Sequence, residues 1–250
     1  MIHRRTAVAL LSAPLLLTGC GGGGAEATER RAASADRPAR ATTPAAAPGA
    51  SAEAAPQRIP GLGPERWAGL PGHSEQAVVV TGRGPDSPVS SVVLHQRTAT
   101  GWQPGTSWPA HNALRGWSDH HLAGDLRSPL GVYTLSDAGG LLADPGSRLP
   151  YTRSGGFRSP GTGFEGEPLD GSFDYVVAVD YNRRPGTSPL DWTRPLGAGR
   201  GGGIWLHVDH GGPTHGCVSI AKAHMKHLLR TLDPARHPVV VMGHADWLAR

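Results

Sequence analysis

Short apolar runs separated by glycine- and proline-rich connections make up most of the chain beyond residue 60. The runs are rich in valine and other β-branched or aromatic residues, which is typical of strands. We expect strands at 76–81, 90–96, 131–135, 173–181, 203–208 and 238–242, with 101–104 as a short hairpin arm. The pattern predicts a mainly β domain.

A helical period occurs in one segment, from Ser219 to Leu232. Its apolar residues recur at steps of three and four, which predicts an amphipathic helix. Ser219 can cap the start, and Asp233-Pro234 can end it. The opposite side holds both lysines of the chain, Lys222 and Lys226, as expected of a solvated face.

Two long segments, 141–171 and 183–202, show no periodic pattern. The chain contains 36 Gly and 23 Pro, a composition that favours turns over long helices. Irregular loops of this length in a compact domain are usually functional borders or unrecognised elements. The sequence leaves these two explanations open.

The N-terminus predicts export. Basic residues at Arg4-Arg5 precede an apolar run from 7 to 17, which is too short to span a bilayer as a helix. Leu17-Thr18-Gly19-Cys20 resembles a bacterial lipobox, in which the cysteine is acylated after cleavage. We therefore expect a signal peptide at 1–19 and a lipid on Cys20, with ordinary secretory cleavage as the alternative.

Residues 20–60 contain no aromatic residue and almost no large aliphatic one. Such a segment cannot bury enough apolar surface to offset the entropy of ordering, so we expect a disordered tether. Residues 61–250 are long enough for one domain with a single core. The lipid would hold this domain at the outer face of the cell membrane, facing the cell wall.

The net charge of +4 does not indicate nucleic acid. Residues 1–60 hold seven of the 24 basic residues and four of the 20 acidic ones, so the folded part is nearly neutral. A nucleic-acid-binding domain concentrates Lys and Arg on one face. We expect no nucleic-acid partner.

The two cysteines, Cys20 and Cys217, would suggest a disulfide in an exported protein. Acylation of Cys20 would leave Cys217 without a partner. An unpaired exported cysteine is either buried and inert or kept for its reactivity.

The neighbours of Cys217 favour reactivity. His207 ends a predicted strand, a loop with Gly211 and Gly212 follows, and His215-Gly216-Cys217 comes just before the predicted helix. An imidazole and a helix N-terminus both favour a thiolate. The glycines let backbone N–H groups approach a substrate and stabilise an oxyanion.

Thr214-His215-Gly216-Cys217-Val218-Ser219 resembles the signature of the L,D-transpeptidase catalytic domain family. The segment from Gly124 to Tyr133 (GDLRSPLGVY) resembles a second motif, found in a branch of the family with a short catalytic loop. The resemblance covers about residues 75 to 245. It implies an L,D-transpeptidase-like β-sandwich or barrel with one α-helix after the catalytic cysteine.

The resemblance also implies the chemistry. Cys217 would attack a peptidoglycan tetrapeptide stem at a meso-diaminopimelate or similar residue, D-alanine would leave, and an acceptor amine would resolve the thioester. His207 would be the acid and base, with its tautomer set by a backbone carbonyl, and His215 would position the thiol. The N–H groups of Gly216 and Cys217 would hold the oxyanion. No cofactor or metal is implied.

Only seven residues lie between His207 and His215, fewer than is usual in the family, which leaves His210 as an alternative base. Water as acceptor would give an L,D-carboxypeptidase. Because His207, Asp209, His210, His215 and Cys217 all have metal-ligand chemistry, a zinc peptidase is a further alternative. The last alternative is a non-enzymatic, wall-associated lipoprotein.

Overall fold

The computed structural model describes residues 57–250. The predicted signal peptide, Cys20 and nearly all of the predicted tether lie outside the described residues. Ile59, two residues before the predicted start of the domain, is buried in an apolar cluster. Among the described residues, no helix is both long and apolar enough to cross a membrane.

The domain is mainly β, as the apolar pattern predicts. The strands are β1 Gln76–Gly82, β2 Val89–Thr98, β3 Gly101–His111, β4 Trp117–Ser118, β5 Ser128–Pro129, β6 Gly131–Thr134, β7 Ala138–Gly140, β8 Tyr151–Arg153, β9 Val176–Ala178, β10 Trp205–Val208, β11 Val218–Ile220 and β12 Val239–His244. The helices are α1 Pro64–Ala68, α2 Lys222–Thr231 and α3 Ala245–Leu248, with 3-10 turns η1 Gly155–Phe157, η2 Ala198–Arg200 and η3 Pro234–Arg236.

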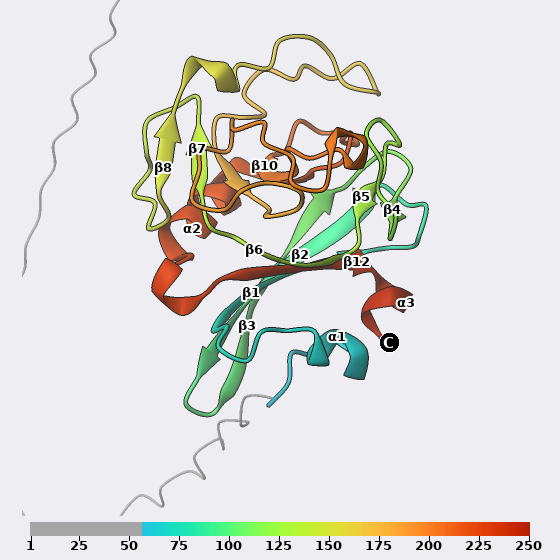
Figure 1. The fold of residues 1–250 in the computed structure, drawn as a ribbon, viewed down its shortest axis with the longest axis vertical. Helices are drawn as coiled ribbons and strands as arrows, with labels where there is room; N and C mark the ends of the chain where they lie inside the picture. The colour runs from blue at the N-terminus through green and yellow to red at the C-terminus, as the bar shows by residue number, and fades with distance from the viewer. Residues whose placement is uncertain (1–56) are drawn as a thin grey trace, which may run out of the picture. The chain divides into compact units, whose positions relative to one another are not determined.

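Ten strands form one sheet in the order β6-β12-β1-β2-β3-β11-β10-β9-β7-β8, and β4 pairs with β5 separately. The pairs β1–β12, β10–β11 and β7–β8 are parallel, and the other pairs of the large sheet are antiparallel. Figure 1 shows the sheet curling, so that β10 and β7 lie across the domain from β1 and β12. This is the β-sandwich type of fold that the sequence predicts.

Strand β1 is buried on both faces, which explains its unbroken apolar run. Val78 and Val80 point into the main core, together with apolar residues of β10, β11 and α2. Ala77 and Val79 point to a second core under α1 and α3. These two short helices lie side by side (Figure 1), and the N–H of Gly63 donates to the carbonyl of Leu248. The main core therefore lies between the two halves of the curled sheet.

The predicted helix from Ser219 to Leu232 is too long at its start. Val218, Ser219 and Ile220 form β11, and α2 begins only at Lys222. Ser219 does not cap the helix, because its hydroxyl donates to Asp209 Oδ1 at 2.7 Å. Pairing of β11 with β10 and β3 overrides the helical period here. The helix buries its Met225, Leu228 and Leu229 face as predicted.

The expected strand at 173–181 is confined to β9, whereas the hairpin arm at 101–104 is only the start of the long strand β3. The segments 141–171 and 183–202 are mostly irregular, with only β8 and single 3-10 turns. A buried ion pair holds the second segment at its base, where Arg183 Nη1 donates to Asp137 Oδ2 at 2.9 Å and also contacts Asp180. Both segments border the site described next.

Candidate active site

Cys217 lies at the end of the loop from β10 to β11, directly before the first residue of β11. Its side chain is half-buried against the cluster that contains Trp205 and Phe157. The Sγ atom accepts from the Trp205 N–H at 3.4 Å and lies 3.5 Å from the carbonyl oxygen of Gly203. The thiol is therefore held by the first residue of β10 and the segment leading into it.

Burial raises the pKa of the Cys217 thiol to about 11, and the N–H of Trp205 only partly opposes this effect. The expectation that a helix N-terminus activates the thiol is wrong, because α2 begins five residues after Cys217. At neutral pH the resting group is therefore a neutral thiol. A nearby base must take its proton during the attack.

His207 lies within β10 and is 2% exposed. Its Nδ1 is 2.9 Å from the carbonyl oxygen of Val208, the type of contact that the family resemblance implies. Because a carbonyl oxygen only accepts, Nδ1 carries the proton and Nε2 is left as the basic nitrogen. Burial lowers the pKa of His207 to about 4, so the imidazole is neutral at pH 7 and able to accept a proton.

His210 stacks on His207, with ring centroids 5.8 Å apart and planes inclined by 9°. Its Nδ1 lies 3.0 Å from Glu167 Oε1. Glu167 comes from the irregular segment 141–171 and approaches so closely that a Cβ on Gly212 would lie 2.3 Å from Oε1. A carboxylate thus orients His210, whereas a main-chain carbonyl orients His207.

Two cavities meet at Cys217. The larger, of about 480 Å³, is lined by His121, Trp192, Arg194, the Gly201–Gly203 run and Gly216. The smaller, of about 220 Å³, is lined by Phe173, His207, His210 and Thr214, among others. Cys217 and His215 line both cavities. A group bound in either cavity would therefore reach the same sulfur atom.

The carbonyl oxygen of Cys217 is held by two hydroxyls. Thr214 Oγ1 donates to it at 2.6 Å and Ser128 Oγ at 3.4 Å, and both side chains are buried. Ser128 belongs to the Gly124–Tyr133 motif, whose Gly124 and Leu126 also line the larger cavity. The two motifs identified in the sequence therefore meet at Cys217.

The N–H groups of Gly216 and Cys217 have no acceptor among residues 57–250. Gly216 packs tightly, because a Cβ there would lie 3.0 Å from Ile204 Cδ1. His215, by contrast, is exposed and packs on Phe164 with ring centroids 4.6 Å apart. Within residues 57–250, the hydrogen-bond partners of the thiol are Trp205 and Gly203 rather than His215.

Asp209 lines neither of the two cavities at Cys217. Burial would raise the pKa of Asp209, but hydrogen bonds from His111 and Ser219 outweigh this effect and lower it to about 2. His111 Nδ1 lies 2.8 Å from Asp209 Oδ1, and this contact raises the pKa of His111. In the described part of the chain, no group of three or more His, Cys, Asp or Glu side chains could hold a metal ion.

The sequence profile of the L,D-transpeptidase catalytic domain (YkuD) matches residues 77–241. The chain belongs to this family. The matched region runs from β1 to β12 and contains both cavities and the Cys217 loop.

Among solved structures, this L,D-transpeptidase domain is similar to Bd1075 of Bdellovibrio bacteriovorus, with 16% identity and a TM-score of 0.34. The alignment covers 67% of this chain and 47% of Bd1075, so the chain spans about half the length of that protein. No curated protein matches the sequence.

Several residues of this site were not singled out from the sequence. Glu167, Thr214 and Ser128 orient His210 or Cys217, and His121, Trp192 and Arg194 line the larger cavity. Ser128 and Thr214 lie within motifs that were recognised. Glu167, Trp192 and Arg194 lie in the two irregular segments. The unusual length of these segments is the one sequence signal that points to them.

Proposed function

We propose that this protein is a cysteine-dependent L,D-transpeptidase that cleaves and rejoins peptidoglycan stem peptides through a thioester on Cys217. Membership of the L,D-transpeptidase family supports the reaction type and the substrate class. The observation that carries the proposal is the position of Cys217 where two cavities meet, one of them lined by His207.

In the first half of the reaction, His207 Nε2 takes the thiol proton as the sulfur attacks the carbonyl carbon of the residue before the terminal D-amino acid. The carbonyl oxygen becomes an oxyanion, for which the free N–H groups of Gly216 and Cys217 are the donors. Collapse breaks the C–N bond, and the imidazolium gives its proton to the leaving amine. The products are a thioester and a free D-amino acid.

In the second half, an acceptor amine attacks the thioester carbonyl and gives one proton to His207. The C–S bond breaks, the sulfur leaves as thiolate, and the imidazolium returns the proton to it. Two cavities beside one sulfur allow donor and acceptor to approach from different sides. This arrangement favours transfer to an amine, although water in place of the amine would give an L,D-carboxypeptidase.

We further propose that the protein is exported and held at the outer face of the membrane by a lipid on Cys20. The lipobox-like residues 17–20 and the short apolar run before them support this placement. The substrate then lies on the same side of the membrane as the enzyme.

Incubation of purified full-length protein with sacculi, followed by mass analysis of the muropeptides, tests the proposed function. New L,D-crosslinked species are expected with the wild-type chain and not with Cys217→Ala. Stems shortened by one residue without crosslinks would identify a carboxypeptidase. Unchanged muropeptides would reject both activities.

A further inference from the structure

The larger cavity beside Cys217 contains one fully charged side chain, the guanidinium of Arg194. The rest of its wall is glycine, small or apolar residues, Trp192 and two histidines, and no carboxylate lines it. A half-buried guanidinium facing a cavity without a carboxylate has donors free to bind an anionic group there. The cavity is therefore suited to an anionic ligand group.

Arg194 is held in place but not neutralised. Its Nη1 donates to the carbonyl oxygens of Asp191 and Thr193 at 3.1 and 3.0 Å. The guanidinium stacks on Trp192, with its carbon 4.7 Å from the ring centroid. No carboxylate of residues 57–250 lies within 4.0 Å of it, and the side chain of Asp191 instead accepts from the Thr193 N–H. The planar guanidinium is therefore already oriented before a ligand binds, and it keeps N–H donors that a ligand can use.

The guanidinium and the thiol of Cys217 border the same glycine segment, Gly202–Gly203. A Cβ on Gly202 would be 2.3 Å from Arg194 Nε, and one on Gly203 would be 3.5 Å from Nη2. The carbonyl oxygen of Gly203 in turn lies 3.5 Å from Cys217 Sγ. The guanidinium and the thiol thus contact the same two-residue backbone segment and border the same cavity.

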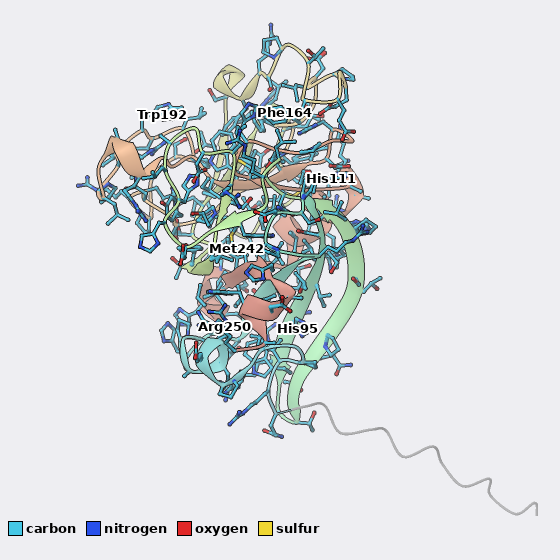
Figure 2. All side chains as sticks on the ribbon, turned by 90° about the vertical axis from the view of Figure 1, so that its right-hand side faces the viewer. His95, His111, Phe164, Trp192, Met242 and Arg250 are labelled. Atoms are coloured by element: carbon cyan, nitrogen blue, oxygen red, sulfur yellow. The ribbon has the colours of Figure 1, made fainter. Side chains whose placement is uncertain are left out.

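His121 also lines the larger cavity. It is 5% exposed, and its Nδ1 has no hydrogen-bond partner among the described residues, although Asp125 Oδ1 is 3.0 Å away. A Cβ on Gly201 would lie 2.8 Å from His121 Nε2. Figure 2 shows Trp192 on a loop that projects from this side of the domain. The lining of the cavity thus includes both a buried imidazole and the exposed Trp192.

We propose that Arg194, stacked on Trp192, binds a carboxylate of the donor stem peptide next to the bond that Cys217 attacks. The proposal rests on the proposed function and names the group that selects the donor. Two carboxylates belong to the residues on either side of the attacked bond: the terminal one of D-alanine and the side-chain one of meso-diaminopimelate. A guanidinium binds either in a bidentate manner.

Binding to full-length Cys217→Ala protein, measured by titration calorimetry, separates the two sources. The probes are the tetrapeptide with meso-diaminopimelate, the same peptide with a C-terminal amide, and the peptide with L-lysine in place of meso-diaminopimelate. Loss of the contacted carboxylate is expected to weaken binding by about tenfold or more, the size of a charge-assisted hydrogen bond. Weaker binding of the amide identifies the terminal group, and weaker binding of the lysine peptide identifies the side-chain group.

Arg194→Gln in the same background retains an amide donor for the two loop carbonyls but removes the charge. It is expected to bind the tetrapeptide about tenfold or more weakly and to lose the preference for the carboxylate. The matched control is Arg184→Gln, which removes an exposed charge from the same segment. This variant should keep both the wild-type affinity for the tetrapeptide and the preference for the carboxylate. A purely structural role of Arg194 would weaken all three peptides equally.

Equal binding by the two variants, equal binding of all three peptides, or no binding of any peptide would overturn the proposal. Failure of the proposed function gives a different pattern: the Cys217→Ala protein binds the tetrapeptide with a carboxylate preference, yet the wild-type chain forms neither a thioester nor a new muropeptide.

Discussion

Thr214 Oγ1 donates a 2.6 Å hydrogen bond to the carbonyl oxygen of Cys217, three residues further along the chain. The bond closes the catalytic loop on itself and fixes the peptide plane beside the nucleophile. Thr214→Val keeps the shape but removes the donor, and we expect acylation to slow by about tenfold, a typical value for one buried hydrogen bond. Thr214→Ser retains the hydroxyl and should stay close to wild type. Equal rates for Val and Ser would show that this bond does not align the sulfur.

A carbapenem should acylate Cys217, because its strained amide carbonyl is a target for the thiol in place of the stem peptide. Intact-mass spectrometry is expected to show one adduct on the wild-type chain and none on Cys217→Ala. A control variant, His224→Gln on α2, lies outside both cavities that meet at Cys217 and should be labelled normally. An unlabelled wild-type chain would contradict the nucleophile assignment.

His207 and His210 are distinguished by the groups that orient them. We expect His207→Ala to reduce carbapenem acylation by two orders of magnitude or more, in the range of about 10²–10⁴ for loss of a general base. His210→Ala and Glu167→Gln should each reduce acylation less than His207→Ala does. If these two variants reduce it equally, His210 and Glu167 act as a unit. Loss of acylation in His210→Ala alone would make His210 the base.

The acylation rate should vary little between about pH 5 and pH 10. His207, with a pKa of about 4, is neutral over this range, and Cys217, with a pKa of about 11, remains protonated. Acid should reduce the rate only as pH falls through about 4, because the base is then protonated. Stopped-flow acylation across this range checks the expectation. A half-maximal rate near pH 6.5 would mean that an unperturbed histidine controls the step.

Asn182 joins the two ends of the loop that bears Arg194. It has a positive φ of 45°, and its Nδ2 donates to the carbonyl oxygens of Gly197 and Gly201 at 3.0 and 2.6 Å. Asn182→Asp tolerates the same backbone but replaces the donors with an acceptor. We expect faster amide hydrogen exchange across 183–203 and a loss of about 2 kcal/mol in unfolding free energy. Exchange in β1 and β12 is the internal control, and unchanged loop exchange would contradict the role of Asn182.

Acid should also destabilise the fold through His95. Burial lowers its pKa to about 4, against 6.5 in the unfolded chain, so the unfolded state binds more protons between these values. The unfolding free energy therefore falls as pH falls through this window, by about 2 kcal/mol between pH 7 and pH 5 for this one group. His95→Gln removes this titrating group. In urea unfolding, the variant should therefore lose about 2 kcal/mol less unfolding free energy between pH 7 and pH 5 than the wild-type chain. Figure 2 shows His95 far from Phe164 and Trp192, so the active site is not altered directly. Parallel curves for the two proteins would reject the assignment.

The β class could be predicted, and Cys217 proposed as the nucleophile, because both signals are local in the sequence. Apolar, β-branched runs such as 76–81 favour strands by their own composition, and the Thr214–Ser219 segment contains its own motif. The predicted start of α2 is wrong because it depends on tertiary pairing rather than on local sequence. Ser219 fits a helix cap by sequence, but its place between β10 and β3 makes it a strand residue with Asp209 as its partner.

The sequence by itself predicted a mainly β domain, with Cys217 as the candidate nucleophile and His207 as its first candidate partner. Only the tertiary structure decided the surroundings of that cysteine. Burial makes the resting group a neutral thiol with a neutral imidazole nearby, and burial depends on packing between residues distant in sequence. The cavities, the carboxylate behind His210 and the cation of Arg194 come from long irregular segments whose course depends on buried hydrogen bonds and ion pairs rather than on any periodic pattern.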